Sequence, residues 1–451
     1  MKKTIRIGAG SAWWGDRVEP AALNAEKGDL DYLSFETMAE ATISAAQVRK
    51  RRDPSFPGYD TYLDDRMRAV LPACLRRGTK IISNQGWINP EGAAERIVHW
   101  LRELGAHGVK VAAVSGSLIT DRVLELTDTI LENGKSTSTL SENLVSAEVY
   151  LGAEPIVEAL KQGAQIVVSG RVADPSIFMA PMMYEFGWDP LDHLHLGRGN
   201  GIGHLLECGA QVTGGYFADP GFKDVPEPWN LAFPIAEVDA DGNAVITKVS
   251  GTGGAVNIQT VKEQMFYEVH DPANYITPDV VVDFTTAKLE QIGPDRVRVT
   301  DMSGKPRTPT LKVSIACMEG HIGEDMFFYA GPGALRRAQL AKRILEERFK
   351  IVGLQAEEIR IDFLGMNAIH GDMSPTNQTE PYEIAVRVAA RTRTREEAIK
   401  VGREVDGMAV SGVGMTGKRV PHQDRTREII GVWSSLVPRE KIVPTISYFT
   451  S

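Results

Sequence analysis

Short apolar runs alternate with amphipathic stretches over about the first 185 residues, and this alternation limits the possible folds more than any other feature of the chain. The runs are rich in β-branched residues, as buried strands are, and the stretches between them place apolar residues at helical spacing. Strands and helices that alternate in this way are typical of an α/β fold with a doubly wound, mostly parallel sheet. We expect its strands at residues 4–7, 30–35, 80–83, 109–114 and 166–168.

The pattern changes near residue 226. Residues 235–249 alternate between apolar and polar types around the turn 239–243, which indicates an antiparallel hairpin. A strong helix is expected at 334–349, and Thr394 with Glu397 forms a capping box before another. We therefore expect an α/β ligand-binding domain at residues 1–225 and an α+β domain at 226–451, with a β-rich portion at 226–330.

Charge and cysteine content limit the partners and the compartment. A net charge of −9 argues against nucleic acid or an anionic membrane as the main partner. Cys74, Cys208 and Cys317 lie far apart without a CxxC pair, which predicts reduced thiols. We find no apolar segment long enough for secretion or for spanning a membrane, so we expect a cytoplasmic protein, and a homo-oligomer on general frequency.

Polar or small residues follow each expected strand of the first domain. Because the carboxyl ends of parallel strands lie along one edge of a sheet, these residues can converge on one crevice. Loops are polar in every α/β domain, so some of the candidates will have no role. The candidates are Gly8, Gly10, Ser11, Asp16, Glu36, Asn84, Ser115, Gly116, Gly170, Arg171 and Asp174.

Arg171 and Asp174 are the first candidates for chemistry. The planar fork of Arg171 suits a carboxylate or phosphate, and Asp174 can orient that fork or transfer a proton. A salt bridge that only ties down the loop is the alternative. The glycine-rich segment 8–16 can bind an anion through its backbone, but the third glycine of a GxGxxG motif would fall on Trp13, which disfavours a nicotinamide cofactor.

His204 and Glu207 are three residues apart and share a face if the segment is helical. They can form an acid–base pair, a hydrogen-bonded structural pair, or two ligands of a divalent metal. The spacing does not decide among these three interpretations. Cys208 beside them is expected to pack as a small apolar residue, because no base is placed to activate it.

Several separate motifs, in order, resemble the acyclic terpene utilisation AtuA family over most of the chain. They are Arg6–Ala12, Gly170–Pro175, Gly203–Gly215, Gly251–Gly254 through Glu263-Gln264, Tyr267-Glu268, Asp271-Pro272 and Thr277–Val280. The resemblance implies a role in the catabolism of branched acyclic terpenes through acyl-CoA intermediates. It also implies an additional small domain of about 100 residues, which is expected here as a separate partner subunit.

Two functions from different classes fit these observations. The first is a lyase, of the hydratase or dehydratase kind, or an isomerase that uses acid–base chemistry on a hydroxy or unsaturated acid or its CoA ester. In it Arg171 holds the acid group, while Glu36, Asp174 or the pair of His204 and Glu207 exchanges protons. The second is a non-catalytic subunit that binds acyl-CoA or a carboxylate. No cofactor is predicted, and participation of a divalent metal is left open.

Overall fold

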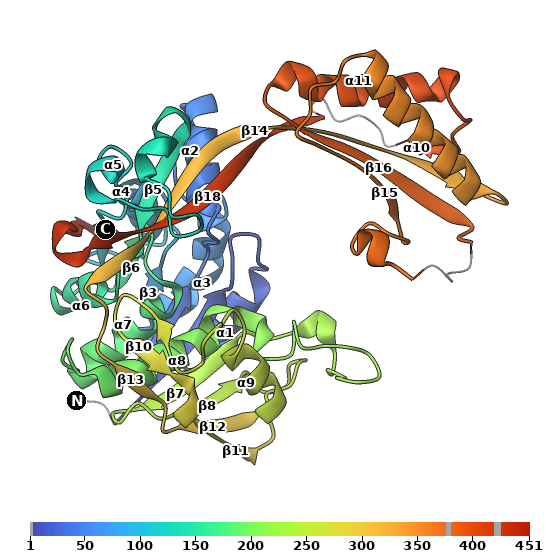
Figure 1. Ribbon diagram of the computed structural model, residues 1–451. Helices are drawn as coiled ribbons and strands as arrows, with labels where there is room; N and C mark the ends of the chain where they lie inside the picture. Colours follow the sequence, from blue (N-terminus) through green and yellow to red (C-terminus); the bar gives the residue numbers. More distant parts are fainter. Residues whose placement is uncertain (1–2, 376–379, 419–424) are drawn as a thin grey trace. The chain divides into compact units, whose positions relative to one another are not determined.

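The chain forms two compact units in the computed structural model shown in Figure 1, which describes residues 3–375, 380–418 and 425–451. One unit comprises residues 1–316 and 432–451, and the other residues 317–431. The boundary expected at residues 225/226 lies inside the first unit, because strands from residues 234–248 pair in its main sheet. The fold is mixed α/β in class.

The main sheet of the first unit has a parallel centre, which confirms the five strands expected from the apolar runs. Its central order is β1-β2-β3-β6-β4, and every neighbouring pair in this series is parallel. These strands are short and almost wholly buried, as strands covered on both faces are. Their bounds are Thr4–Ser11 for β1, Tyr32–Phe35 for β2, Lys80–Ser83 for β3, Lys110–Ser115 for β4 and Ile166–Ser169 for β6.

Antiparallel strands extend this sheet on both sides, so the sheet is mixed. The expected hairpin is β7 (Pro234–Asp239) and β8 (Ala244–Lys248), and β7 pairs antiparallel with β1. Beyond β8 lie β12 (Arg296–Thr300) and β11 (Lys288–Gly293). On the far edge β19 (Thr445–Thr450) pairs antiparallel with β4. The C-terminal strand therefore covers the edge that β4 would otherwise expose.

Helices connect the parallel strands. In α4 the side chain of Asn89 caps the N-terminus by accepting from the Gly92 amide, and Pro90 occupies the first position, where its missing N–H has no cost. The helices of the first unit are α1 (Glu19–Lys27), α2 (Thr42–Arg52), α3 (Leu63–Arg77), α4 (Pro90–Glu103), α5 (Val123–Leu126), α6 (Glu154–Lys161), α7 (Asp174–Phe186), α8 (His193–Glu207) and α9 (Ile258–Met265).

Close packing of α7 on α8 sets the positions of Asp174, at the start of α7, and Glu207, at the end of α8. α8 is glycine-rich, and a Cβ added at Gly203 would lie 2.4 Å from the carbonyl oxygen of Pro175. A Cβ at Gly199 would lie 3.0 Å from Met179 Cγ of α7. The absence of side chains at these points lets the two helices approach, and this brings the start of α7 beside the end of α8.

A smaller sheet and the pairing of β5 with β14 complete the first unit. The sheet has the order β13-β10-β9, with β9 at Tyr275–Ile276, β10 at Val281–Asp283 and β13 at Ser303–Lys305. β5 (Leu144–Val149) pairs with β14 (Thr310–Ala330). The chain passes from the first unit into the second within β14 and returns within β18 (Thr426–Pro438).

The described residues of the second unit form an antiparallel sheet and two α-helices. The sheet order is β15-β16-β14-β17, with β15 at Glu358–Leu364, β16 at Glu383–Thr392 and β17 at Gly417–Lys418. The helices are α10 (Ala334–Ile351) and α11 (Arg395–Ser411), and their buried residues join Phe327, Val386 and Val388 in one core. Thr394 caps α11 by accepting from the Glu397 amide, which is one half of the expected capping box; the Glu397 carboxylate accepts from the Gln355 amide at 2.8 Å instead.

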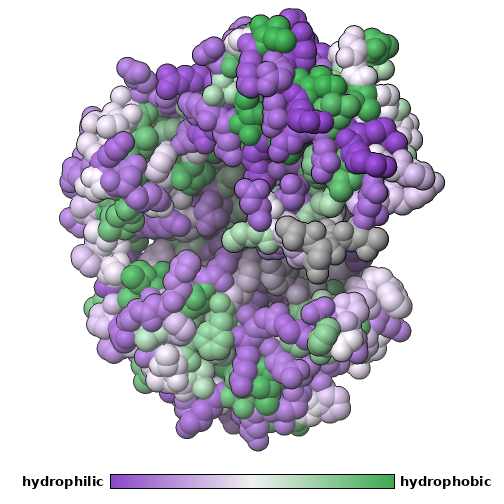
Figure 2. All heavy atoms as spheres, turned by 45° about the vertical axis from the view of Figure 1, so that its right-hand side comes forward, coloured by the Kyte–Doolittle hydropathy of each residue, from purple (hydrophilic) through white to green (hydrophobic). Residues whose placement is uncertain are grey.

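The surface drawn in Figure 2 is mostly hydrophilic, with hydrophobic residues in small groups. Throughout the ranges that the structure describes, none of the helices combines the length and the apolar character needed to cross a membrane.

Candidate functional site

A cavity of about 550 Å³ lies in the first unit at the carboxyl ends of β1 and β2. Its wall comes from the loop after β1, the segment after β2, the start of α7, the end of α8 and the segments that follow α8 and α9. None of the described residues that line it is lysine, arginine or histidine. Six carboxyl side chains line it, from Asp16, Glu36, Glu40, Asp174, Glu207 and Glu268.

Four of these carboxyl residues, Asp16, Glu36, Asp174 and Glu207, are candidates that the sequence singled out, and the structure brings them to one cavity. They come from four separate segments of the chain. The convergence follows from the parallel centre of the sheet, which places the ends of β1, β2 and β6 along one edge.

Glu36 is held in place by two donors. The Asn84 Nδ2 and the Met38 backbone N–H donate to its Oε1 at 3.0 and 2.6 Å. Asn84 is itself fixed, because its Oδ1 accepts from the amide and the hydroxyl of Thr37. Burial raises the pKa of Glu36 well above its ordinary value, and the charge of Asp174 adds to the rise, while Arg171 and Asn84 oppose it.

Asp174 stands between the cavity and Arg171. The Arg171 Nη2 donates to Asp174 Oδ1 at 2.7 Å, and Nη1 donates to the Met38 carbonyl at 3.1 Å. Arg171 is 2% exposed and does not line the cavity. Burial raises the pKa of Asp174 to about 7, and Arg171 opposes the rise. The ion pair expected from the sequence is present, with its carboxylate half facing the cavity.

His204 lies behind Glu207 in the same way. Its Nδ1 is 3.2 Å from Glu207 Oε1, and its ring packs against Tyr275 and Phe284 at centroid distances of 5.1 and 5.4 Å. The histidine is 1% exposed and does not line the cavity, whereas Glu207 does. Within the described part of the chain, no group of three or more His, Cys, Asp or Glu side chains is arranged to hold a metal ion. Burial raises the pKa of the Cys208 thiol, which also lines the cavity.

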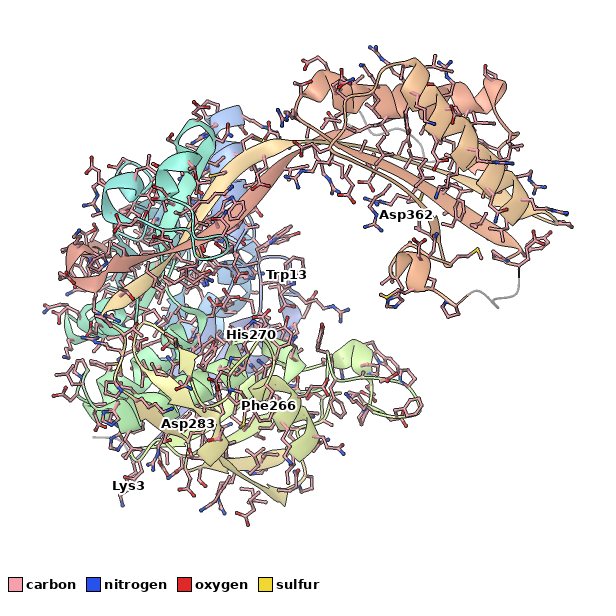
Figure 3. The ribbon with its side chains drawn as sticks, in the orientation of Figure 1. Lys3, Trp13, Phe266, His270, Asp283 and Asp362 are labelled. Carbon is pink, nitrogen blue, oxygen red and sulfur yellow. The ribbon has the colours of Figure 1, made fainter. Side chains whose placement is uncertain are left out.

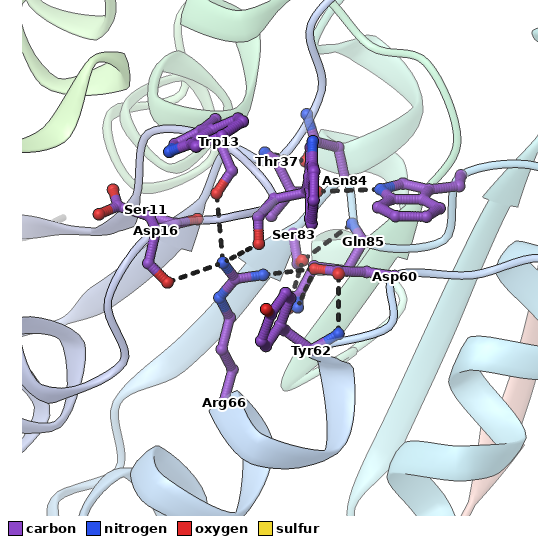
Figure 4. Close-up of polar contacts among 12 residues, drawn as sticks. Ser11, Trp13, Asp16, Thr37, Asp60, Tyr62, Arg66, Ser83, Asn84 and Gln85 are labelled. Atoms are coloured by element: carbon purple, nitrogen blue, oxygen red, sulfur yellow. Dashed lines mark hydrogen bonds and ion pairs between the residues drawn. The ribbon is translucent and has the colours of Figure 1, made fainter. Parts of the chain in front are cut away.

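The loop after β1 is fixed by a buried ion pair that the sequence did not reveal (Figure 4). Arg66 in α3 pairs with Asp60, and both side chains are fully buried. The Arg66 Nη2 donates to the Trp14 and Trp13 carbonyls at 2.7 and 3.2 Å. Asp60 also accepts from Gln85 Nε2 at 2.9 Å. The sequence did contain a signal for this ion pair: Arg66 falls at helical spacing between Leu63 and Val70, on the apolar face of α3, where a charged residue needs a buried partner.

Asp16 ends that loop and faces the cavity. Its Oδ2 accepts from the Ala12 amide at 2.9 Å, and its Oδ1 accepts from the Arg17 amide at 2.8 Å. Burial raises the pKa of Asp16, and these two backbone bonds oppose the rise. Asp16 therefore both closes the turn and contributes a carboxyl group to the wall.

Gly8, Gly10 and Ser11 belong to β1 and not to a ligand-binding loop, and none of them lines the cavity. A Cβ at Gly8 would lie 2.6 Å from Leu30 Cδ1, and one at Gly10 would lie 2.5 Å from Phe35 Cε1. Glycine at these positions admits the neighbouring side chains. The Ser11 hydroxyl donates to the Glu36 carbonyl at 2.5 Å.

Ser115, Gly116 and Gly170 also lie outside the cavity wall. The Ser115 hydroxyl donates to Glu91 Oε1 at 2.5 Å, and a Cβ at Gly116 would lie 3.0 Å from Pro444 Cα, where the chain enters β19. A Cβ at Gly170 would lie 2.9 Å from the Ser117 hydroxyl. The residues that follow β4 therefore do not reach the cavity that the other strand ends form, and β19 pairs along β4 up to Ser115.

Tyr267 and Glu268 line the cavity, although the sequence suggested no role for them beyond their place in the AtuA-like motifs. Burial raises the pKa of Glu268. The same two residues line an adjoining open groove of about 730 Å³. Phe266, labelled with Trp13 in Figure 3, belongs to this groove, and Phe222 in it is 88% exposed. Two lysines, Lys223 and Lys262, line the groove together with Glu263 and Glu268, and Lys223 pairs with Glu263 at 2.5 Å.

Comparison with known proteins identifies one family. The family described as acyclic terpene utilisation family protein AtuA matches residues 5–448, which is nearly the whole chain. A search of curated proteins found no match. A search of solved structures found none either.

Proposed function

The chain belongs to the acyclic terpene utilisation AtuA family, and from this premise we propose that it is a catabolic enzyme that adds or removes water, or shifts a proton, on an unsaturated or hydroxy acyl group. The family is implicated in acyclic terpene utilisation. The reaction class is our inference from the cavity.

The observation that supports this proposal is a pair of carboxyl groups, Glu36 and Asp174, which face one cavity and have pKa values raised by burial. A carboxyl group with an ordinary pKa is ionised at neutral pH and cannot act as an acid. A carboxyl group with a pKa near 7, as at Asp174, can hold or release a proton near neutral pH, which is the condition for general acid–base catalysis.

The surroundings of the two groups suggest a division of labour. Arg171 stabilises the ionised form of Asp174, which suits a base that takes a proton from the carbon beside a carbonyl group. Glu36 has no cationic partner at hydrogen-bond distance among the described residues, so its proton is available for a leaving hydroxyl group. In dehydration the C–H electron pair forms the double bond and the hydroxyl leaves as water with the proton of Glu36. Hydration is the reverse.

The cavity favours an uncharged reacting group. Six carboxyl side chains would repel an anion placed among them, whereas a thioester carbonyl carries no charge. The adjoining groove offers the aromatic faces of Phe222 and Phe266 together with Lys262, which suit the remainder of a CoA ester. We therefore propose an acyl-CoA ester as the substrate in preference to an acid that binds wholly inside the cavity.

A subunit that binds acyl-CoA without turning it over is the second candidate. The open groove with Phe222 and Phe266 exposed favours it, because binding needs these surfaces and no proton transfer. The cavity favours the enzyme, since buried carboxyl groups with raised pKa values have no use in a simple binding site.

A substrate screen with matched variants tests the proposal. Unsaturated and 3-hydroxy acyl-CoA esters are incubated with the wild-type protein and analysed for water addition, water loss or double-bond migration. Turnover is expected to fall at least about 100-fold in Glu36→Gln and Asp174→Asn, because each removes a proton-transfer group. Glu142→Gln, an exposed glutamate, is the control and is expected to retain activity. Binding of the esters without turnover by the wild type would support the second candidate instead.

A further inference from the structure

A group of buried polar atoms without partners lies beside Arg171, and its residues do not line the acidic cavity. Within the described residues, Arg171 Nε, Tyr150 Oη and Glu148 Oε2 are buried and accept or donate no hydrogen bond. Buried polar atoms are nearly always paired in folded proteins, so three in one place call for an explanation. The three residues are close to one another, because the Arg171 guanidinium lies 4.1 Å from the Tyr150 ring centroid and Glu148 is two residues from Tyr150 on an extended segment.

A second cation reaches the same ring. Lys312 on β14 places its Nζ 4.9 Å from the Tyr150 ring centroid, and the Tyr150 amide donates to the Lys312 carbonyl. Lys312 is exposed, and among the described residues no carboxylate lies within ion-pair distance of its Nζ, although its charge contributes to lowering the pKa of Glu132. Two cations thus lie near one phenol ring, and among the described residues Asp174 is the only carboxylate bonded to either of them.

The group contains an excess of donors. Burial raises the pKa of Tyr150 to about 12 and that of Glu148 to about 8, so at neutral pH both side chains carry a proton. With the Nε–H of Arg171 and the ammonium group of Lys312 the group has four donors, and the three buried ones have no hydrogen-bond partner among the described residues. Water can satisfy the neutral donors, but it does not balance the positive charge. An anion does both.

We propose that Arg171, Tyr150, Glu148 and Lys312 form a subsite for a carboxylate of the substrate. A carboxylate accepts about four hydrogen bonds through its two oxygens, which matches these donors in number. A phosphate dianion is less suitable, because the carboxyl groups of Glu40 and Asp174 lie close enough to Glu148 to raise its pKa. This subsite deepens the proposed function, on which it rests: the substrate is an acyl group whose reacting carbons lie in the acidic cavity and whose separate carboxylate lies beside Tyr150.

Binding of simple anions tests the subsite without any turnover. Calorimetric titration of the whole protein with succinate measures the affinity for a carboxylate, and succinamide serves as the uncharged analogue of the same shape. Succinate is expected to bind and succinamide is not. Lys312→Met and Tyr150→Phe are expected to weaken succinate binding about tenfold or more, because each removes a donor to a charged group. Lys161→Met, which removes an exposed lysine of α6, is the control and is expected to bind as the wild type does.

Three results would overturn the assignment: no binding of succinate to the wild type, binding of succinate by Lys312→Met and Tyr150→Phe as tight as by the wild type, or tighter binding of inorganic phosphate than of succinate. The test is separable from that of the proposed reaction. If the wild type binds succinate through this subsite but no acyl-CoA ester is turned over, the reaction is wrong and the subsite stands. If esters are turned over equally well by wild type and Lys312→Met, the subsite is wrong and the reaction stands.

Discussion

Replacement of Arg66 by methionine removes one half of the buried ion pair that holds the loop after β1. Both side chains are fully buried, so solvent screening does not reduce the effect. Breaking such a pair by removing one partner costs about 3–5 kcal/mol, because the other charge stays buried. Gln85 and the Tyr62 amide still donate to Asp60, which places the expected loss in the free energy of unfolding near the lower end, about 3 kcal/mol.

Tryptophan fluorescence is a suitable assay, because every tryptophan lies in the first unit and the signal reports on that unit alone. They are Trp13, Trp14, Trp87, Trp100, Trp188, Trp229 and Trp433. Urea unfolding is expected to show a lower midpoint for Arg66→Met. The double variant Asp60→Asn/Arg66→Met is expected to recover about 1–2 kcal/mol, because no charge is then left unpaired. Arg76→Met on the same helix breaks an exposed pair with Glu26 and is expected to cost less than about 1 kcal/mol.

The pH dependence adds a second check. Burial already raises the pKa of Asp60, and loss of Arg66 raises it further. The native state then holds a proton that the unfolded state has lost, so the deficit of Arg66→Met is expected to grow as pH rises above the unfolded pKa and to shrink as pH falls. A deficit equal to that of Arg76→Met, or a double variant no more stable than Arg66→Met, would refute the reasoning.

Two further predictions concern the site and its support. Burial raises the pKa of Asp174 in the folded state to about 7, so its contribution to stability falls as pH rises from the unfolded pKa of about 3.9 toward 7. Asp174→Asn is therefore expected to flatten the dependence of the urea midpoint on pH in that window. An unchanged slope would contradict the raised pKa. Gly203→Ala is expected to destabilise the protein by about 1–3 kcal/mol, because the new methyl group would meet the Pro175 carbonyl. The control is Gly407→Ala in α11, whose methyl group meets nothing within 4 Å, and it is expected to be neutral or stabilising. Equal calorimetric unfolding midpoints for the two variants would count against the close packing of α7 on α8.

Local sequence patterns predicted the strands of the sheet centre but not its edges. The apolar runs at β1, β2, β3, β4 and β6 are signals that each segment carries by itself. The placement of β19 beside β4 depends on pairing between residues more than 300 positions apart, and the 21 residues of β14 serve two units in turn. Periodicity carries no information about such distant pairing. The domain boundary was expected at residue 225 because the sequence pattern changes there from alternating strands and helices to an antiparallel hairpin. That hairpin, β7 and β8, joins the same sheet as β1.

The sequence predicted those residues of the candidate site whose position follows from the end of a strand. It did not predict those whose role depends on which side chains pack against them. Glu36, Asp174 and Glu207 face the cavity as strand-end logic and helical spacing indicated. Gly8 and Gly10 have the composition of a ligand-binding loop, but they serve to admit Leu30 and Phe35. Arg171 was expected to hold the substrate through its fork, and the fork is instead occupied by Asp174 and the Met38 carbonyl. The donor that remains, Nε, is visible only in the folded protein.

Exchange of hydrogen with the solvent tests the central claim most directly. An acyl-CoA ester that binds is incubated with the protein in D₂O, and deuterium at the carbon beside the carbonyl group is measured by mass spectrometry. An acid–base site incorporates deuterium in the wild type, and Glu36→Gln and Asp174→Asn are expected to lower the rate at least about 100-fold while the ester still binds. No incorporation by the wild type with any ester that binds, or rates in both variants equal to that of the wild type, would contradict acid–base chemistry in this cavity.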